Sequence, residues 1–308
     1  MHYRHLHYFV KIVEAGSFSQ AARTIHVAQP ALSQQIGELE ASLGVSLLKR
    51  SARGVRPTLA GQRLYEEASS ILRKLDNLPG LVRSSGGEVQ GQVSLGMPAS
   101  LSTTLVGLMI AECKANYPKI TLKFIDGDSE FLREEVEKSR LDLALAYEDE
   151  FFPVVLRQPL FRQNHYLISG RHSPPAAGPT ISLKEVAKVP LVLPAALNAR
   201  RVVIDRTFAK AGLSLNLAAE AVTVSSELSA VRSGAASTIL NLGDMSGFSL
   251  DDFAEPVLIE PVFYLTCCLI WSSEFPLTLA AEGVKKLLVN FLKVHIAQTK
   301  RPGAVWVA

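Results

Sequence analysis

Residues 9–61 read FVKIVEAGSFSQAARTIHVAQPALSQQIGELEASLGVSLLKRSARGVRPTLAG, and this stretch decides the fold of the first part of the chain. Apolar residues recur at helical spacing and stop at Gly16, which is typical of a helix that ends at a glycine. Ser19 is expected to be the N-cap of a short second helix. A third helix is expected to begin near Pro30, because a proline at the first helical position loses no hydrogen bond.

The expected third helix has an apolar and a polar face. Its inward face carries apolar residues spaced 4, 3 and 4 apart, namely Leu32, Ile36, Leu39 and Leu43. Its outward face starts with polar side chains, namely Gln29, Ser33 and Gln34. Two helices joined by a tight turn, with polar side chains at the exposed start of the second, form a helix-turn-helix. Amides and hydroxyls in that place suit the reading of base edges in the major groove of DNA.

Cations follow this helix and dominate the first part of the chain. The stretch 49–58, KRSARGVRPT, contains a Gly and a Pro that fit a β-turn wing, and its four cations fit contacts with phosphate or the minor groove. Residues 1–65 hold eight Lys and Arg against three Glu, a net charge of +5, so the rest of the chain carries −2 of the total +3. A basic N-terminal segment on a slightly acidic body indicates an anionic polymer as the partner of that segment.

The pattern AxxxxxxQPALSQQIxxLExxLGxxLxxR in this stretch resembles the winged helix-turn-helix of the LysR-type transcriptional regulators. The resemblance covers nearly the whole chain and is greatest to the nitrogen assimilation control and Cbl-like branch. It implies double-stranded promoter DNA as a partner, RNA polymerase as a candidate partner, and a cytoplasmic location. Ala28 stands where the family usually has Ser or Thr, and the loss of that N-cap costs about 1 kcal/mol unless Gln29 partly replaces it. The DNA interface implied by the resemblance and the polar face comprises Ser19, Gln29, Pro30, Ser33, Gln34, Arg50 and Arg53.

A long helix with an apolar seam is expected from about Ala60. The seam has the 4-3 spacing of a coiled coil and comprises Leu64, Ala68, Ile71, Leu75, Leu78 and Val82. In the family this helix pairs with its counterpart, which implies a homodimer or homotetramer; the alternative is that the helix docks onto its own chain. Pro79-Gly80 is expected to break the helix, and residues 84–87 are expected to form a flexible hinge.

From Gly91 onward, predicted strands alternate with predicted helices, which indicates an α/β domain with a parallel sheet. Strands are expected at 92–97, 121–125, 141–147, 166–169, 191–193, 217–221, 238–242 and 263–271, and helices at 104–117, 131–138, 200–211 and 277–295. The resemblance implies two Rossmann-like subdomains in a periplasmic-binding-protein-like arrangement with an effector cleft between them. The expected domains are the winged helix-turn-helix at 1–59, the linker helix and hinge at 60–90, and the effector domain at 91–308. Within the effector domain, subdomain I is expected at about 91–160 and 267–300, and subdomain II at about 161–266.

Segments expected to open helices lie just beyond strand ends, where open α/β folds bind ligands. Helix N-termini favour anions, and Arg200 or Arg201 could clamp a carboxylate, sulfate or phosphate, although two adjacent arginines are not expected to point inward together. Asp128 would repel an anion unless it faces an arginine or a donor on the ligand. The expected effector site comprises Ser100, Ser102, Thr103, Asp128, Arg200, Arg201 and Ser225. The alternative is that both arginines lie on the helix surface and that the protein acts without an effector.

The sequence also argues against other classes of protein. It contains no G-x-S-x-G elbow, P-loop or H-E-x-x-H motif, so no catalytic constellation can be assembled. The three cysteines are not spaced like the ligands of a metal site. His2, His5 and His7 are expected to be surface residues rather than metal ligands. No export signal and no apolar run of membrane-spanning length is found, which argues against a transport-type binding protein. The family's usual GxGxxxLP stretch is altered to GAASTILNL from Gly234. The family pattern is therefore the poorest guide to this chain at the ligand loop of subdomain II. A regulator without enzymatic activity, cofactor or metal is therefore expected.

Overall fold

The computed structural model describes residues 1–51, 54–83, 89–147, 155–173, 178–245, 248–299 and 303–307. The chain forms two compact units, Met1–Gly86 with Lys138–Arg140, and Gly87–Glu137 with Leu141–Ala308. Within the described ranges, no helix has the length and apolar character needed to cross a membrane.

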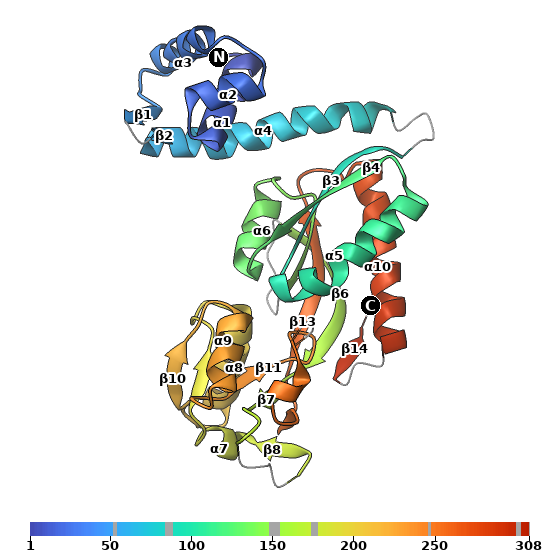
Figure 1. The fold of residues 1–308 in the computed structure, drawn as a ribbon. Coiled ribbons are helices and arrows are strands. Elements are labelled where there is room, and N and C mark those ends of the chain that lie inside the picture. Colours follow the sequence, from blue (N-terminus) through green and yellow to red (C-terminus); the bar gives the residue numbers. More distant parts are fainter. Residues whose placement is uncertain are drawn as a thin grey trace. The chain divides into compact units, whose positions relative to one another are not determined.

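The first unit contains three short helices, a β-hairpin and a long helix (Figure 1). The elements are α1 (Tyr3–Ala15), α2 (Phe18–Thr24), α3 (Gln29–Leu43), β1 (Leu48–Ser51), β2 (Gly54–Pro57) and α4 (Leu59–Arg83). Apolar side chains from all four helices close one core, which includes Phe9, Ile12, Ala21, Leu32, Ile36, Leu39, Ala68 and Leu72. The periodicity of the sequence correctly placed the inward face of α3, except that Leu43 remains exposed at the end of the helix.

The hairpin is the wing expected from the sequence. β1 and β2 pair antiparallel with Lys49 opposite Arg56. A hydrogen bond joins the wing to the turn between α1 and α2, since the Val55 N–H donates to the Gly16 carbonyl at 2.8 Å. Gly54 has a φ of 115°, and a Cβ there would lie 2.7 Å from that same carbonyl oxygen, so only glycine allows this close approach.

Two helix ends differ from the expectation. Ser17, not Ser19, is the N-cap of α2, because the helix begins at Phe18 and the Ser17 hydroxyl accepts from the Gln20 N–H. The predicted break at Pro79-Gly80 is wrong, since α4 continues to Arg83. A proline inside a helix removes one backbone hydrogen bond and crowds the carbonyl four residues earlier, which can kink a helix without ending it. The expected hinge, 84–87, lies outside the described residues. The absence of a side-chain cap at Ala28 agrees with the expectation.

The second unit is built on a mixed six-stranded sheet with the order β14-β6-β13-β5-β3-β4. Its strands are β3 (Gly91–Met97), β4 (Ile120–Asp126), β5 (Leu143–Tyr147), β6 (Val155–Asn164), β13 (Tyr264–Ser272) and β14 (Ala304–Trp306). β3 runs parallel to β4 and β5, but β13 returns antiparallel to β5 and β6, so the sheet is not wholly parallel as expected. Three helices join this sheet: α5 (Ala99–Asn116), α6 (Ser129–Glu137) and α10 (Leu279–Thr299).

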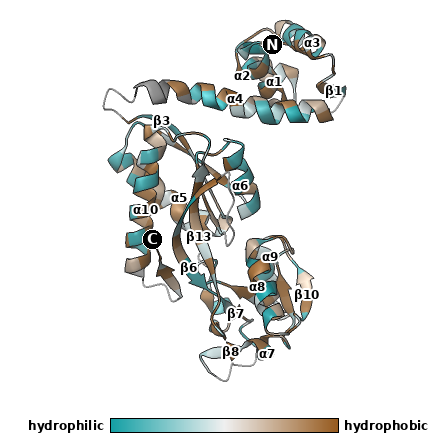
Figure 2. Ribbon diagram, turned by 180° about the vertical axis from the view of Figure 1, so that it is seen from behind, coloured by the Kyte–Doolittle hydropathy of each residue, from teal (hydrophilic) through white to brown (hydrophobic). Residues whose placement is uncertain are grey.

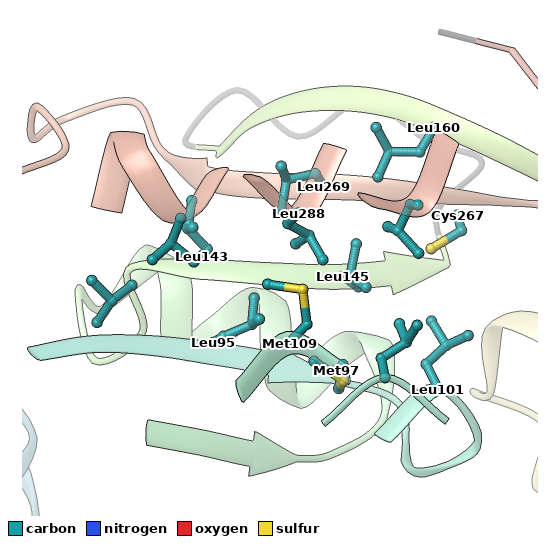
Figure 3. Close-up of a cluster of buried hydrophobic side chains, with 14 of the residues drawn as sticks. Leu95, Met97, Leu101, Met109, Leu143, Leu145, Leu160, Cys267, Leu269 and Leu288 are labelled. Atoms are coloured by element: carbon teal, nitrogen blue, oxygen red, sulfur yellow. The ribbon is translucent and has the colours of Figure 1, made fainter. Parts of the chain in front are cut away.

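The largest core lies between this sheet and helices α5 and α10. Figure 3 shows Leu95 and Leu145 from the strands facing Met109 of α5, with Leu288 of α10 on the same cluster. These side chains are almost completely buried. The core explains why the C-terminal helix returns to the first half of the domain, as the sequence indicated.

The second subdomain has a four-stranded sheet in the order β11-β7-β12-β8 and a two-stranded parallel sheet of β10 and β9. Its strands are β7 (Tyr166–Ile168), β8 (Thr180–Ser182), β9 (Leu191–Leu193), β10 (Leu217–Glu220), β11 (Thr238–Leu240) and β12 (Val257–Glu260). Its helices are α7 (Leu183–Val186), α8 (Ala199–Lys210), α9 (Val224–Arg232) and the short η2 (Leu250–Asp252).

The chain crosses between the subdomains twice, after β6 and before β13. Both strands belong to the six-stranded sheet along their whole length, a few residues beyond the boundaries expected at 160 and 267. The sequence did not predict β6, because Pro159 interrupts its pattern. The register shifts between Cys267 and Cys268, next to Pro159, and this bulge lets a proline lie within the ladder.

Candidate DNA interface, helix seam and effector cleft

The start of α3 presents a polar face to the surface. Gln29, Pro30 and Gln34 are exposed and Ser33 is half-buried, while Leu32 and Ile36 point into the core. The helical period therefore produces the outward polar face expected from the sequence. Ser19 is also exposed, on α2.

Arg50 connects the wing to the two helices of the motif. Its guanidinium donates to the Ser33 hydroxyl at 3.0 Å, and its Cζ lies 4.3 Å from the centroid of the Phe18 ring. A cation held over an aromatic face in this way is positioned by both contacts. Lys49 and Arg56, opposite each other on the hairpin, are exposed. Arg53 lies outside the described residues.

A carboxylate also belongs to the polar face, and the sequence analysis missed it. Glu38 accepts from the Gln34 amide at 2.9 Å and from the Gln35 amide at 2.8 Å. Behind it, the Nε2 atom of His5 in α1 lies 3.7 Å from a Glu38 oxygen. The i,i+3 and i,i+4 spacing of these residues on one helix is the signal that would have found them.

The apolar seam of α4 divides into two parts. Ala68 is completely buried in the core of the first unit, so the prediction that it makes a dimer contact is wrong, whereas Leu64 is half-buried against the same core. They pack inward because α4 lies against α1 along its first half. The other three predicted residues are exposed, at 42% for Ile71, 40% for Leu75 and 48% for Leu78. Figure 2 shows hydrophobic and hydrophilic residues alternating along this helix. The side chain of Val82 is not among those described.

A cavity of about 480 Å³ lies between the two subdomains of the second unit. It is lined by the first turns of α5, α8 and α9, by the end of β4 and by the loop after β11. Five of the predicted effector residues line it: Ser100, Thr103, Asp128, Arg200 and Ser225. The other two do not. The buried Ser102 hydroxyl donates to Asp126, and Arg201 folds along α8 to the Pro194 carbonyl.

Both arginines bind carboxylates of the protein itself. The Arg200 guanidinium lies 2.5 Å from a Glu227 oxygen and 3.0 Å from the Ile239 carbonyl oxygen. Arg201 pairs with Asp205 at 2.8 Å and with Glu220 at 3.1 Å. Only 7% of Arg200 and 9% of Arg201 is exposed. The two side chains leave α8 in different directions and only Arg200 lines the cavity, which agrees with the expectation that two adjacent arginines do not point inward together.

The Glu227 carboxyl completes a buried network with Arg200. Its second oxygen accepts from the Thr238 hydroxyl at 2.7 Å. Burial raises the pKa of Glu227, although the neighbouring charge of Arg200 acts in the opposite direction. Arg200 is thus matched by a carboxylate of the protein and is not a free clamp for an anion.

Aspartates give the cavity a carboxylate-rich lining. Asp128 accepts from the Phe131 N–H at 2.8 Å and so caps α6. Asp244, which the sequence analysis missed, is buried and accepts from the Asn241 amide at 2.6 Å. Burial raises the pKa of Asp244, and the neighbouring charge of Arg200 partly counteracts this. No sequence signal pointed to Asp244, which lies two residues beyond the altered stretch 234–242.

Other reactive residue types are not gathered into sites. Cys113, Cys267 and Cys268 are buried, and none of the three forms a disulfide among the residues that the structure describes. Within the ranges that the structure describes, no group of three or more His, Cys, Asp or Glu residues could hold a metal ion.

Comparison with known proteins places these features in one family. Residues 3–62 match the family described as bacterial regulatory helix-turn-helix protein, lysR family, and residues 86–293 match the LysR substrate binding domain. The nitrogen assimilation regulatory protein nac of Klebsiella aerogenes is 31% identical over 296 residues, 95% of each chain. Its counterpart in Escherichia coli K12 is 29% identical over 98% of each chain. These relatives belong to the nitrogen assimilation control branch expected from the sequence.

Solved structures share the fold over the full length. A single-residue variant of full-length OxyR from Pseudomonas aeruginosa has a TM-score of 0.72 at 20% identity, over 95% of each chain. Full-length CbnR in complex with its target DNA has a TM-score of 0.69 at 23% identity, over 95% of this chain and 98% of that one. The second unit alone matches a family model over well more than half of the chain. The chain therefore belongs to the LysR family and is a DNA-binding transcriptional regulator, not an enzyme.

Proposed function

We propose that this regulator binds promoter DNA as a homodimer or homotetramer, inserts the start of α3 into the major groove, and responds to a small molecule in the cleft of its second unit. The observation that carries the proposal is the polar face of Gln29, Ser33 and Gln34, which stands beside the cationic hairpin. The major groove admits an α-helix, and Gln can pair bidentately with adenine. DNA as the ligand further implies that the protein acts in the cytoplasm, where RNA polymerase is its candidate partner.

The cations next to α3 fit the phosphate backbone. Lys49 and Arg56 are exposed on the hairpin, and Arg50 is held beside Ser33. Contacts to phosphate position a protein on the duplex, whereas contacts to base edges select the sequence. We therefore assign the hairpin to positioning and the start of α3 to selection, with Ser19 at the edge of the same interface.

The experiment that tests this division uses a duplex selected by the full-length protein from a random-sequence library. Gln34→Ala should lose affinity for the selected duplex while keeping its affinity for random duplex, because a lost bidentate contact costs about 1–3 kcal/mol of discrimination. Gln62→Ala is the matched control, since Gln62 bonds to Glu66 four residues on, as Gln34 bonds to Glu38. Equal losses on both duplexes for Gln34→Ala would refute the assignment.

The cleft supports an effector that carries two kinds of polar group. The first turns of α5 and α9 line the cavity with Ser100, Thr103 and Ser225, and helix N-termini with hydroxyls favour an anionic group. Asp128 and Asp244 line the same cavity and favour a hydrogen-bond donor or a cation. The arginine clamp is not available, so the helix N-termini would hold the anion. A small zwitterion, such as an amino acid, meets both requirements.

Thermal-shift screening tests the effector class with pairs of small carboxylates that differ by one amino group. Binding of the amino compounds should raise the unfolding temperature of the wild type more than binding of the plain carboxylates does. Asp128→Asn should remove that preference while keeping the cap of α6, because Asn caps helices as well as Asp. If no compound of either kind binds, the effector-free alternative is favoured. That alternative is supported by the two internally paired arginines.

A further inference from the structure

We infer that Glu38 is a positioning residue for base recognition, whose carboxylate sets the orientation of the Gln34 and Gln35 amides before DNA arrives. The inference rests on the proposed reading of bases by α3. Glu38 was not among the residues expected at the DNA interface, because a glutamate on a DNA-binding face contributes no attraction to phosphate.

The geometry that carries the inference is a carboxylate shared by two amides. Each oxygen of Glu38 accepts from a different amide, Oε1 from Gln34 at 2.9 Å and Oε2 from Gln35 at 2.8 Å. An ionised carboxylate is only an acceptor, so it favours the amide orientation that turns Nε2 toward it. Both glutamines are therefore held in one of the two orientations that an amide can otherwise exchange.

The amide orientation that Glu38 favours leaves available the polar groups of Gln34 that a base edge requires. A primary amide has two N–H groups and a carbonyl oxygen, and the carboxylate uses only one N–H. One N–H and the carbonyl oxygen of Gln34 remain, which is the pair that bonds adenine N7 and N6. Ordering a free side chain at an interface weakens binding about two- to tenfold, and a side chain ordered in advance avoids part of that loss.

The Glu38 carboxylate lies next to the buried His5 side chain of α1. His5 is buried with 8% of its surface exposed, and its Nε2 lies 3.7 Å from Glu38 Oε2. The His5 ring comes from α1, whose Phe9 and Ile12 belong to the core of the unit. A buried ring on a packed helix restricts the positions open to the carboxylate and joins the reading face of α3 to the core.

The charge of Glu38 acts on all duplexes alike. A carboxylate beside the interface repels phosphate and so weakens binding to every sequence. Specificity is a difference between two affinities, so this shared loss cancels in the ratio of selected to random affinity. The ratio therefore reports the orientation of the amides, and the affinity for random duplex reports the charge.

The test compares full-length Glu38→Ala, Glu38→Gln and Gln34→Ala with the wild type on the selected and random duplexes. Glu66→Ala is the matched control, because Glu66 makes the same i,i+4 bond to Gln62 on α4 at 3.1 Å. Unfolding temperatures check that every variant is folded. We expect Glu38→Ala to lower the ratio of selected to random affinity about two- to tenfold, with the affinity for random duplex unchanged or higher. Glu38→Gln, which keeps an acceptor but loses the charge, should fall between Glu38→Ala and the wild type.

Two outcomes separate this inference from the proposed function. If Gln34→Ala lowers the ratio but Glu38→Ala leaves it at the wild-type value, the positioning role is wrong and the reading role of Gln34 stands. If Gln34→Ala also leaves the ratio unchanged, base reading by Gln34 is wrong, and the role of Glu38 is wrong with it. A fall of the ratio for Glu66→Ala equal to that for Glu38→Ala would overturn the inference as well, because it would reflect loss of any surface carboxylate.

Discussion

The exposed half of the α4 seam provides the sharpest quantitative prediction, which is that Ile71→Asp together with Leu75→Asp strongly weakens the dimer. Complete burial of one Ile or Leu side chain contributes about 1.5–3 kcal/mol. Ile71 and Leu75 expose 42% and 40% of their surface, so each has about 0.6–1.2 kcal/mol to gain from a partner. A two-fold symmetric pair of helices buries four such side chains, which amounts to about 2.5–5 kcal/mol. Because 1.4 kcal/mol is a tenfold change, the double variant should weaken the dimer about 60-fold or more, and buried carboxylates add to this loss.

Light scattering over a concentration series measures this change on the full-length protein. Leu59→Asp is the control, since Leu59 begins the same helix off the seam and is 76% exposed. The unfolding temperature of the monomeric unit should hardly change, because neither Ile71 nor Leu75 belongs to its core. An undiminished oligomer mass for the double variant at low micromolar concentration would refute the reasoning and would place the contact between subunits elsewhere.

Three further predictions concern single residues. Arg50→Ala should weaken binding to selected and random duplexes by similar factors and flatten the salt dependence, because it removes a cation next to the interface; a sequence-dependent loss in a salt titration would contradict this. Glu227→Ala should lower the free energy of unfolding by about 3–5 kcal/mol, since it leaves the buried Arg200 without its counter-ion; urea unfolding measures this, and a loss below about 1 kcal/mol would show that the pair contributes little. Burial lowers the pKa of His165 to about 4, so the unfolded chain binds more protons between pH 6.5 and 4, and stability should fall as the pH drops through that window. His165→Phe, which can keep the ring stack on Phe263, should remove this part of the pH dependence in thermal unfolding, and an unchanged slope would assign it to other groups.

The sequence by itself determined the features that depend on residues close together in the chain. The inward face of α3, the glycine that ends α1 and the cationic hairpin follow from helical period and turn chemistry within a few positions. The alternation of strands and helices after Gly91 likewise indicated the α/β class and the return of β13 to the first subdomain. These local rules were enough to place the DNA-binding motif and the family.

Only the tertiary structure decided which partner each long polar side chain takes. Arg200 pairs with Glu227, and Arg201 pairs with Glu220, across separations that no local period connects. The same holds for the seam of α4, where packing against α1 turned Leu64 inward and left the rest of a regular 4-3 pattern exposed. A long charged side chain can reach any carboxylate within several ångströms, so its partner depends on how whole elements pack. The 4-3 repeat of α4 shows that one face of the helix is apolar, but not what covers that face.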